Sequence, residues 1–255
     1  MEKEQSGNMA MLHSRSRLMI LCVLFIVSGC AKDGGVCVSS TGQIIQQVRN
    51  IPDYTEIDIR NNVNLILSTD SVNKVIVEAG QNIIGGVTTK VVNGQLLISN
   101  NSKCNWLRDY SRPVNVYISN SKLWKITYNG SGNITTAGTL KQDSLNIQVW
   151  GGCGTIELTV DLWQGSFSLI MGTVDYKLHG VSAITSVYMN DYGLYDARDM
   201  KTGYTFITSK GSNDGYVQAV NYLEATITSI GNIYYLGDPK SVKVTRTGAG
   251  DLLPL

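Results

Sequence analysis

Apolar and polar residues alternate along most of this chain, which is the pattern of strands that bury one face. The segments 56–59, 63–67 and 74–78 alternate in this way, whereas helical spacing at i, i+3, i+4 and i+7 does not persist for any useful length. Residues 87–92 and 95–99 flank Asn93-Gly94, a dipeptide typical of a hairpin with a type I′ turn. The pattern predicts an all-β protein.

From residue 121 onward, a short turn rich in glycine returns at a nearly constant spacing. The first residues of successive turns are 22, 20, 19, 20, 18 and 19 positions apart, and alternating runs such as 145–149 and 156–162 flank the turns. A fixed period near twenty residues is typical of a solenoid in which each repeat forms one coil. The turns are Gly130-Ser131-Gly132, Gly152-Cys153-Gly154, Gly172-Thr173-Val174, Asp191-Tyr192-Gly193, Gly211-Ser212-Asn213, Ser229-Ile230-Gly231 and Gly248-Ala249-Gly250.

We therefore predict a right-handed parallel β-helix with coils of about 20 residues and two strands in each coil. Residues 48–120 form its first part and residues 121–255 form the glycine-turn coils. Equivalent turn residues should lie in one column, because each coil stacks on the one before. Glycine, asparagine and aspartate suit such corners because they tolerate positive φ. We interpret four acidic residues as turn formers for this reason, namely Asp175, Asp191, Asp214 and Asp251.

A second series of equivalent positions follows the turns. If the coils are in register, these side chains stack about 4.8 Å apart along the axis of the solenoid. We interpret the series as a structural spine and keep a ligand platform as the alternative. Its members are Ile134, Ile156, Tyr176, Tyr195, Tyr216 and Tyr234.

The first 29 residues have the pattern of a lipoprotein signal peptide. Residues 18–27 are ten consecutive apolar residues, too few for the roughly twenty that span a bilayer. The sequence Val27-Ser28-Gly29-Cys30 follows directly and resembles a bacterial lipobox, so Cys30 is the expected lipidation site and the lipid anchors the protein to the membrane. An ordinary secretory signal with an incidental cysteine is the alternative, and initiation at Met9 or Met11 stays open. Residues 30–47 are mostly small and polar, and we predict that they form a flexible tether between the lipid and a domain at 48–255.

Charge and cysteine content exclude several classes of function. The 21 Lys+Arg balance 20 Asp+Glu, and no basic face stands out that would attract nucleic acid. His179 is the one histidine after the signal, and the cysteines form no metal-binding motif, so we expect no metal and no cofactor. A Cys37–Cys104 disulfide is an alternative to free buried thiols at Cys37, Cys104 and Cys153.

Parallel β-helices also occur among carbohydrate-cleaving enzymes, so we consider whether any carboxylates of this chain could be catalytic. Asp191, Asp196 and Asp199 lie close in sequence, and His179 with Asp175 is the other combination that could act on a substrate. Coils of 18–22 residues leave little room for the inserted loops that would enclose a cleft. We therefore expect a protein that is not an enzyme and has no catalytic residues.

Binding is the class that remains, and the tryptophans are its candidates. The alternation places Trp150 and Trp163 on the outside, whereas Trp124 alternates inward with Ile126 and Tyr128. Exposed tryptophans can stack on sugar rings or anchor a protein partner. We predict that Trp150 and Trp163 contact a ligand, and the alternative is that a loop or a neighbouring strand of the protein covers them.

Several short motifs, in a specific order, resemble the putative auto-transporter adhesin head GIN domain family. The resemblance covers roughly residues 48–255. It implies a β-helical fold, a lipoprotein of Bacteroides-type bacteria and an adhesive role, and it supplies no catalytic residues. We thus expect a lipid-anchored envelope protein on the periplasmic or surface side of the outer membrane, an adhesin for glycan or protein ligands. A structural scaffold that docks partners is the alternative. The motifs are Val48-Arg49-Asn50-Ile51, Ile57-Asp58-Ile59, Val75-Ile76-Val77, Asn93-Gly94-Gln95-Leu96, Val114-Asn115-Val116-Tyr117, Leu123, the Gly130-Ser131-Gly132 repeat, Tyr235-Leu236-Gly237-Asp238-Pro239 and Gly248-Ala249-Gly250.

Overall fold

The computed structural model describes residues 41–68, 73–102 and 113–255. The predicted signal peptide, Cys30, Cys37 and Cys104 lie outside these ranges. Nearly all of the regular structure is strand, as the alternation predicts. The elements are β1 (Ile44–Arg49), β2 (Glu56–Asn61), β3 (Asn64–Ser68), β4 (Lys74–Gly80), the 3₁₀ turn η1 (Ile84–Gly86), β5 (Val87–Val92), β6 (Gln95–Asn100), β7 (Asn115–Ser119), β8 (Lys125–Gly130), β9 (Ile134–Ala137), β10 (Leu140–Leu169), β11 (Thr173–Met189), β12 (Tyr195–Ser209), β13 (Gly215–Ile227), β14 (Ile233–Leu236), β15 (Ser241–Arg246) and β16 (Leu252–Pro254).

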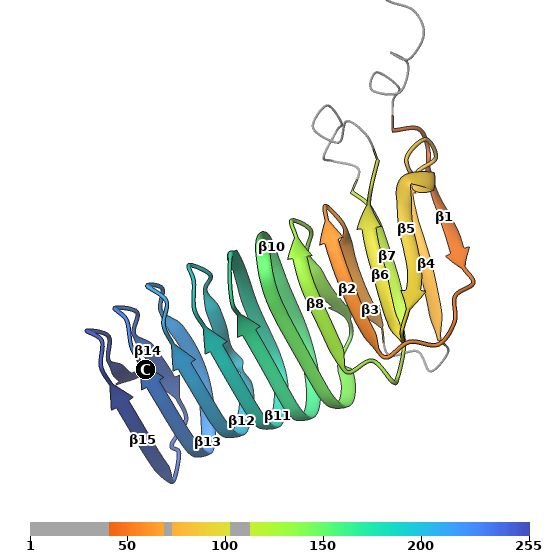
Figure 1. Ribbon diagram of the computed structural model, residues 1–255. Coiled ribbons are helices and arrows are strands. Elements are labelled where there is room, and N and C mark those ends of the chain that lie inside the picture. The colour runs from red at the N-terminus through yellow and green to blue at the C-terminus, as the bar shows by residue number, and fades with distance from the viewer. Residues whose placement is uncertain (1–40, 69–72, 103–112) are drawn as a thin grey trace, which may run out of the picture. The chain divides into compact units, whose positions relative to one another are not determined.

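The strands wind into a β-solenoid of about six turns, which confirms the predicted parallel solenoid with coils of about 20 residues (Figure 1). Each coil contributes one strand to each of two stacks of parallel strands, and β10 to β13 bend from one stack to the other. Sheet 1 contains β6, β2, β8, segments 146–152, 164–169, 184–189, 204–209 and 222–227, and β15. Sheet 2 contains β7, β3, β9, segments 153–162, 173–182, 195–202 and 215–218, and β14 and β16.

The turn residues lie in a column, as predicted. Gly152 pairs with Gly130, and a Cβ built on any of several turn glycines would overlap a carbonyl oxygen of the previous coil. The glycines are needed mainly for this close approach. Positive φ, the reason given by the sequence pattern, applies within the turns only at Gly152, Gly154 and Gly172. The overlapping pairs include Gly172 over Gly152, Gly211 over Asp191, Gly248 over Ser229 and Gly250 over Gly231.

The acidic and amide side chains beside the turns bind the main chain of neighbouring coils. Asp175 Oδ1 accepts a hydrogen bond from Leu194 N at 2.8 Å, and Asp214 Oδ1 accepts one from Asn232 N at 2.8 Å. Asp191 Oδ2 accepts from Gly172 N at 2.7 Å. Asp251 Oδ1 accepts instead from the adjacent Leu252 N at 2.7 Å. Asp191, Asp214 and Asp251 lie in turns as predicted, whereas Asp175 lies in β11, so its assignment as a turn former is wrong. Asp175, Asp191 and Asp214 also join successive coils.

The predicted spine of six side chains is wrong in its second half. Ile134, Ile156, Tyr176 and Tyr195 do form one buried column, but Tyr195 pairs next with Gly215. Tyr216 and Tyr234 belong to the adjacent column that faces outward, where their rings stack at 5.2 Å. A shift of one residue along a strand moves a side chain to the opposite face. The sequence spacing does not reveal this shift.

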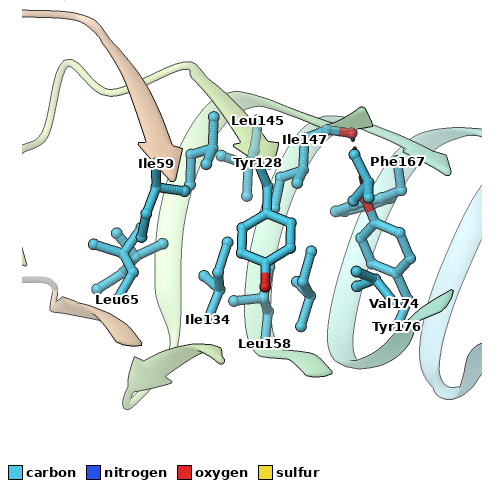
Figure 2. Close-up of a cluster of buried hydrophobic side chains, with 14 of the residues drawn as sticks. Ile59, Leu65, Tyr128, Ile134, Leu145, Ile147, Leu158, Phe167, Val174 and Tyr176 are labelled. Carbon is cyan, nitrogen blue, oxygen red and sulfur yellow. Dashed lines mark hydrogen bonds between the residues drawn. The ribbon is translucent and has the colours of Figure 1, made fainter. Parts of the chain in front are cut away.

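The core fills the space between the two sheets with side chains from every coil. Figure 2 shows Tyr128 and Tyr176 packed among aliphatic residues such as Ile147 and Leu158. The hydroxyl groups of Tyr128 and Tyr176 both find hydrogen-bond partners inside the protein. Tyr128 Oη donates to Gly132 O or Cys153 O, both at 2.7 Å, and Tyr176 Oη lies 3.2 Å from Ser168 O. Burial raises the pKa of both tyrosines, so they stay neutral donors.

The first coils do not follow one another in chain order. β2 pairs with both β6 and β8, and β3 pairs with both β7 and β9. The β2–β3 coil therefore lies between the β6–β7 coil and the β8–β9 coil, which Figure 1 shows as orange strands between yellow-green and green ones. The chain therefore returns across its own first coil before it continues into the later coils.

Antiparallel strands cover the outer side of the β6–β7 coil. β4 pairs antiparallel with β7, β1 with β4, and β5 with β6. The β5–β6 hairpin turns at Asn93 (φ 51°) and Gly94 (φ 77°), which confirms the predicted type of turn. β1 begins at Ile44, so the fold includes residues that the sequence assigned to the tether at 30–47. The residues of β1 are ordered because they pair with the edge strand β4, and the composition of residues 30–47 does not predict this pairing.

A carboxylate ties this antiparallel cap together. Glu78 on β4 accepts hydrogen bonds from Gln46 Nε2 (2.7 Å) on β1 and from Asn115 Nδ2 (2.9 Å) and Tyr117 Oη (3.0 Å) on β7. These hydrogen bonds hold the pKa of Glu78 below its usual value. The bond from Gln46 has the largest effect, and the bond from Asn115 has the next largest. The charged form of Glu78 therefore favours the paired arrangement of three strands.

We predict that Gly211→Ala destabilises the protein because its Cβ would overlap Asp191 O, although the φ of Gly211 is not in the left-handed region. The expected loss in the free energy of unfolding is about 1–3 kcal/mol, measured by urea denaturation. Gly85→Ala is the matched control because a Cβ there meets nothing within 4 Å. Equal stability of the two variants would contradict the close-approach role of the glycine column.

Candidate functional site

The two tryptophans predicted to bind a ligand are both exposed, but they lie at different places. The exposed fraction is 51% for Trp150 and 66% for Trp163. Trp150 immediately precedes Gly151 and Gly152 and so lies beside the glycine column. Trp163 lies at the opposite turn of the coil, where β10 passes from sheet 2 to sheet 1. The structure does not bring the two together.

The inward placement of Trp124 is wrong. Its side chain is 41% exposed, and the neighbouring Leu123, at 2%, is the residue that enters the core. Trp124 precedes β8, which begins at Lys125, so it belongs to the turn rather than to the strand. Alternation counted backward from Ile126 therefore gives the wrong face.

Trp124 and Trp163 line the same groove, which has a volume of about 560 Å³. The groove lies where three successive coils turn from sheet 2 into sheet 1. The first turn contributes residues 121–124, the second residues 141–144, and the third Asp161 and Trp163. Its lining side chains are Ser121, Lys122, Leu123, Trp124, Lys141, Gln142, Asp143, Ser144, Asp161 and Trp163.

The groove exists because one coil is longer than the others. The step from Gly130 to Gly152 is 22 residues, whereas the later steps are 18 to 20. One surplus residue is Trp150, where the register with β8 shifts between Val149 and Gly151. The rest of the surplus precedes Asn146, where the mostly exposed residues 141–144 lie between Leu140 and Leu145, which are 3% and 1% exposed. The two buried leucines hold the ends of this excursion, so its polar side chains project from a fixed base.

Asn120 is hydrogen-bonded to both of the first two turns, to one through its side chain and to the other through its main-chain carbonyl. The Asn120 side chain, on a residue only 7% exposed, donates from Nδ2 to Tyr54 O and accepts at Oδ1 from Lys122 N, both at 2.8 Å. The Asn120 carbonyl accepts from Gln142 Nε2 at 3.3 Å. The side-chain bonds hold the turn at 121–124 against Tyr54, and the bond from Gln142 connects the second turn to it.

Charges around the groove occur as opposite pairs. Lys122 Nζ lies 3.8 Å from Asp53, and Lys141 Nζ lies 3.7 Å from Asp161. Behind Trp124, Lys125 Nζ lies 5.8 Å from the indole centroid and 3.5 Å from Glu56. The exposed pairs contribute little stability, but they balance the local charge.

The carboxylates considered for catalysis each have a partner. Asp175 and Asp191 bind main-chain N–H groups of neighbouring coils. Asp196 binds Arg198 with both oxygens, at 2.9 and 2.5 Å, and this hydrogen bonding holds the pKa of Asp196 below its usual value. Asp199 lies 3.4 Å from His179 Nδ1.

The His179 group extends to a second carboxylate. Glu157 Oε1 lies 3.9 Å from His179 Nε2, across the ring from Asp199. These are outward-facing side chains of three successive coils.

The described ranges contain no group of three or more His, Cys, Asp and Glu residues that could hold a metal ion. Cys153 is a free thiol, but it is exposed, so the expectation that it is buried is wrong, because its side chain lies in an outward-facing turn. Within residues 41–68, 73–102 and 113–255, no helix is long and apolar enough to cross a membrane.

The sequence of this chain matches a known protein family. The model of the family described as "Putative auto-transporter adhesin, head GIN domain" matches residues 53–239. The chain belongs to this family. Membership identifies the protein with putative adhesins, suggests a location in the cell envelope or at the surface, and suggests a non-enzymatic role. No curated protein matches the chain.

Solved structures support the same fold. A putative adhesin from Bacteroides fragilis aligns with a TM-score of 0.74 at 18% identity, over 84% of this chain and 97% of that chain. A putative adhesin from Parabacteroides distasonis gives 0.63 at 18% identity, over 84% and 98%. A putative lipid binding protein from the same species gives 0.61 at 21% identity, over 85% and 98%. At these identities the likeness shows the head GIN fold alone.

Sequence reasoning found Trp163 but missed the groove beside it. The signal that could have revealed the groove is the 22-residue step, which is the longest in the series. Extra residues in one coil of a solenoid must project outward, because the stacked strands leave no room for them.

We predict that Asn120→Ala lowers the free energy of unfolding by about 1–3 kcal/mol, because Tyr54 O and Lys122 N lose a buried partner. Lys122→Ala serves as the control, since that side chain is 72% exposed, and should stay within about 0.5 kcal/mol of the wild type. Urea denaturation measures both. Two variants of equal stability would show that Asn120 does not hold the turns together.

Proposed function

We propose that this head GIN protein is an adhesin of the cell envelope. Lipid on Cys30 anchors it to the outer membrane, and Trp150 and Trp163 on the solenoid contact a glycan or protein on another surface. The observation that carries the proposal is the exposure of these large aromatic side chains on a regular stacked scaffold. Rigid exposed tryptophans provide much contact area with little loss of side-chain entropy on binding.

The partners of the acidic residues support binding rather than catalysis. A glycosidase needs two carboxylates across a cleft, one of which donates a proton. Here Asp175 and Asp191 accept main-chain hydrogen bonds, and Asp196 is neutralised by Arg198. The family description as adhesin agrees with this assignment.

One structural neighbour is named a putative lipid binding protein. Burial of an acyl chain inside this solenoid would require an apolar cavity. The interior is instead filled by the protein's own side chains, including the fully buried Phe167, Tyr176 and Tyr195. This packing supports a ligand that binds on the outer surface.

We expect the double variant Trp150→Ala/Trp163→Ala to fold as the wild type does and to lose most attachment to glycan-coated and host-cell surfaces. Both side chains are more than half exposed, so their removal leaves no core cavity. Attachment of intact cells that express each form measures the effect, with thermal melting as the folding check. The single variants show which tryptophan the attachment needs.

Protease treatment of intact cells provides the independent control on location. An adhesin must be cleaved from outside, and a Cys30→Ser variant should no longer stay with the membrane. A protein that resists external protease, together with full attachment by the double variant, would favour the scaffold alternative.

A further inference from the structure

We propose that the groove between Trp124 and Trp163 is a binding site for a neutral saccharide. The inference rests on the proposed binding function and identifies its ligand class and its site. The groove volume of about 560 Å³ lies within the roughly 300–1,000 Å³ range of small-molecule sites. Trp150 lies outside the groove lining.

The two indoles supply the apolar contact that sugar rings need. The C–H-rich face of a pyranose packs against an aromatic ring, and Trp124 and Trp163 are 41% and 66% exposed at the groove. The residue before each tryptophan in the chain is buried: Leu123 is 2% exposed and Leu162 is 4% exposed. The main chain under both indoles is therefore held by the core.

The polar part of the lining matches sugar hydroxyl groups. Ser121, Gln142, Asp143 and Ser144 present hydroxyl, amide and carboxylate groups along the turns. Hydroxyls of a sugar both donate and accept hydrogen bonds, so a mixed set of donors and acceptors suits them. The Asn120 network holds two of the contributing turns before any ligand arrives, which lowers the entropic cost of binding.

The charge balance of the groove favours a neutral ligand over an anionic one. Lys122 and Lys141 are the lysines of the lining, and each lies within 4.0 Å of a carboxylate. A sulfated or carboxylated sugar would have to displace Asp53 or Asp161 and would meet the charge of Asp143. A neutral sugar meets none of these costs.

The test uses tryptophan fluorescence titration and calorimetry of the folded domain with neutral gluco-, manno-, galacto- and xylo-oligosaccharides. Sialylated and sulfated oligosaccharides form the second arm. We expect a neutral oligosaccharide to bind, and Trp124→Ala and Trp163→Ala to weaken that binding roughly tenfold or more. Trp163→Phe should lose less, because an aromatic face remains. Tyr192→Ala is the matched control, because this aromatic side chain is 65% exposed and lies outside the groove lining, and it should bind as the wild type does.

Each other outcome overturns the inference. These outcomes are no binding of any neutral oligosaccharide, tighter binding of the anionic sugars, or an equal loss in Tyr192→Ala. If cells still attach through the tryptophans while no sugar binds or competes, the adhesin proposal stands and the saccharide groove does not. If the sugar binds as expected but cells do not attach, the groove inference stands and the adhesin proposal fails.

Discussion

The close stacking of one coil on the next is the constraint on which the rest of this structure depends. Strands of parallel sheets lie about 4.8 Å apart, and the corners between them must approach as closely as the strands do. At the glycine column, carbonyl oxygens occupy the space where a Cβ would stand. Side-chain oxygens of Asn133, Asp175 and Asp214 then bind main-chain N–H groups of the following coil. The turns are thus part of the stacking interaction and not merely connections.

The same constraint explains where functional variation can occur. Inside the solenoid, a residue added to a strand reverses the faces of those that follow, as the register of Tyr216 illustrates. Outside, extra residues can project without disturbing the core. The excursion at 141–144 is such an addition, held by Leu140 and Leu145, and it creates the groove with Trp124 and Trp163. A regular scaffold with one enlarged turn can therefore carry a specific site.

The sequence predicts the fold well because the determinants of a solenoid are local and repeated. Spacing of glycine turns gave the period, and alternation gave the exposed faces of Trp150 and Trp163. The prediction from sequence failed where pairing between strands distant in the chain determines the arrangement. Neither the insertion of the β2–β3 coil between β6–β7 and β8–β9 nor the pairing of β1 with β4 follows from any local pattern. The groove was missed for a related reason, since Trp124 lies in a turn where alternation does not apply.

A designed disulfide tests the stacked register most directly. Cys153 and Thr173 are register partners in successive coils, and both are exposed. Paired strands place Cα atoms at distances that a disulfide can span. Thr173→Cys should therefore form a bond with Cys153 under mild oxidation, detected by peptide mapping, whereas Tyr192→Cys, a further coil away, should not. A Cys153 that bonds in the Tyr192→Cys variant and not in Thr173→Cys would contradict the stacking of coils at this register.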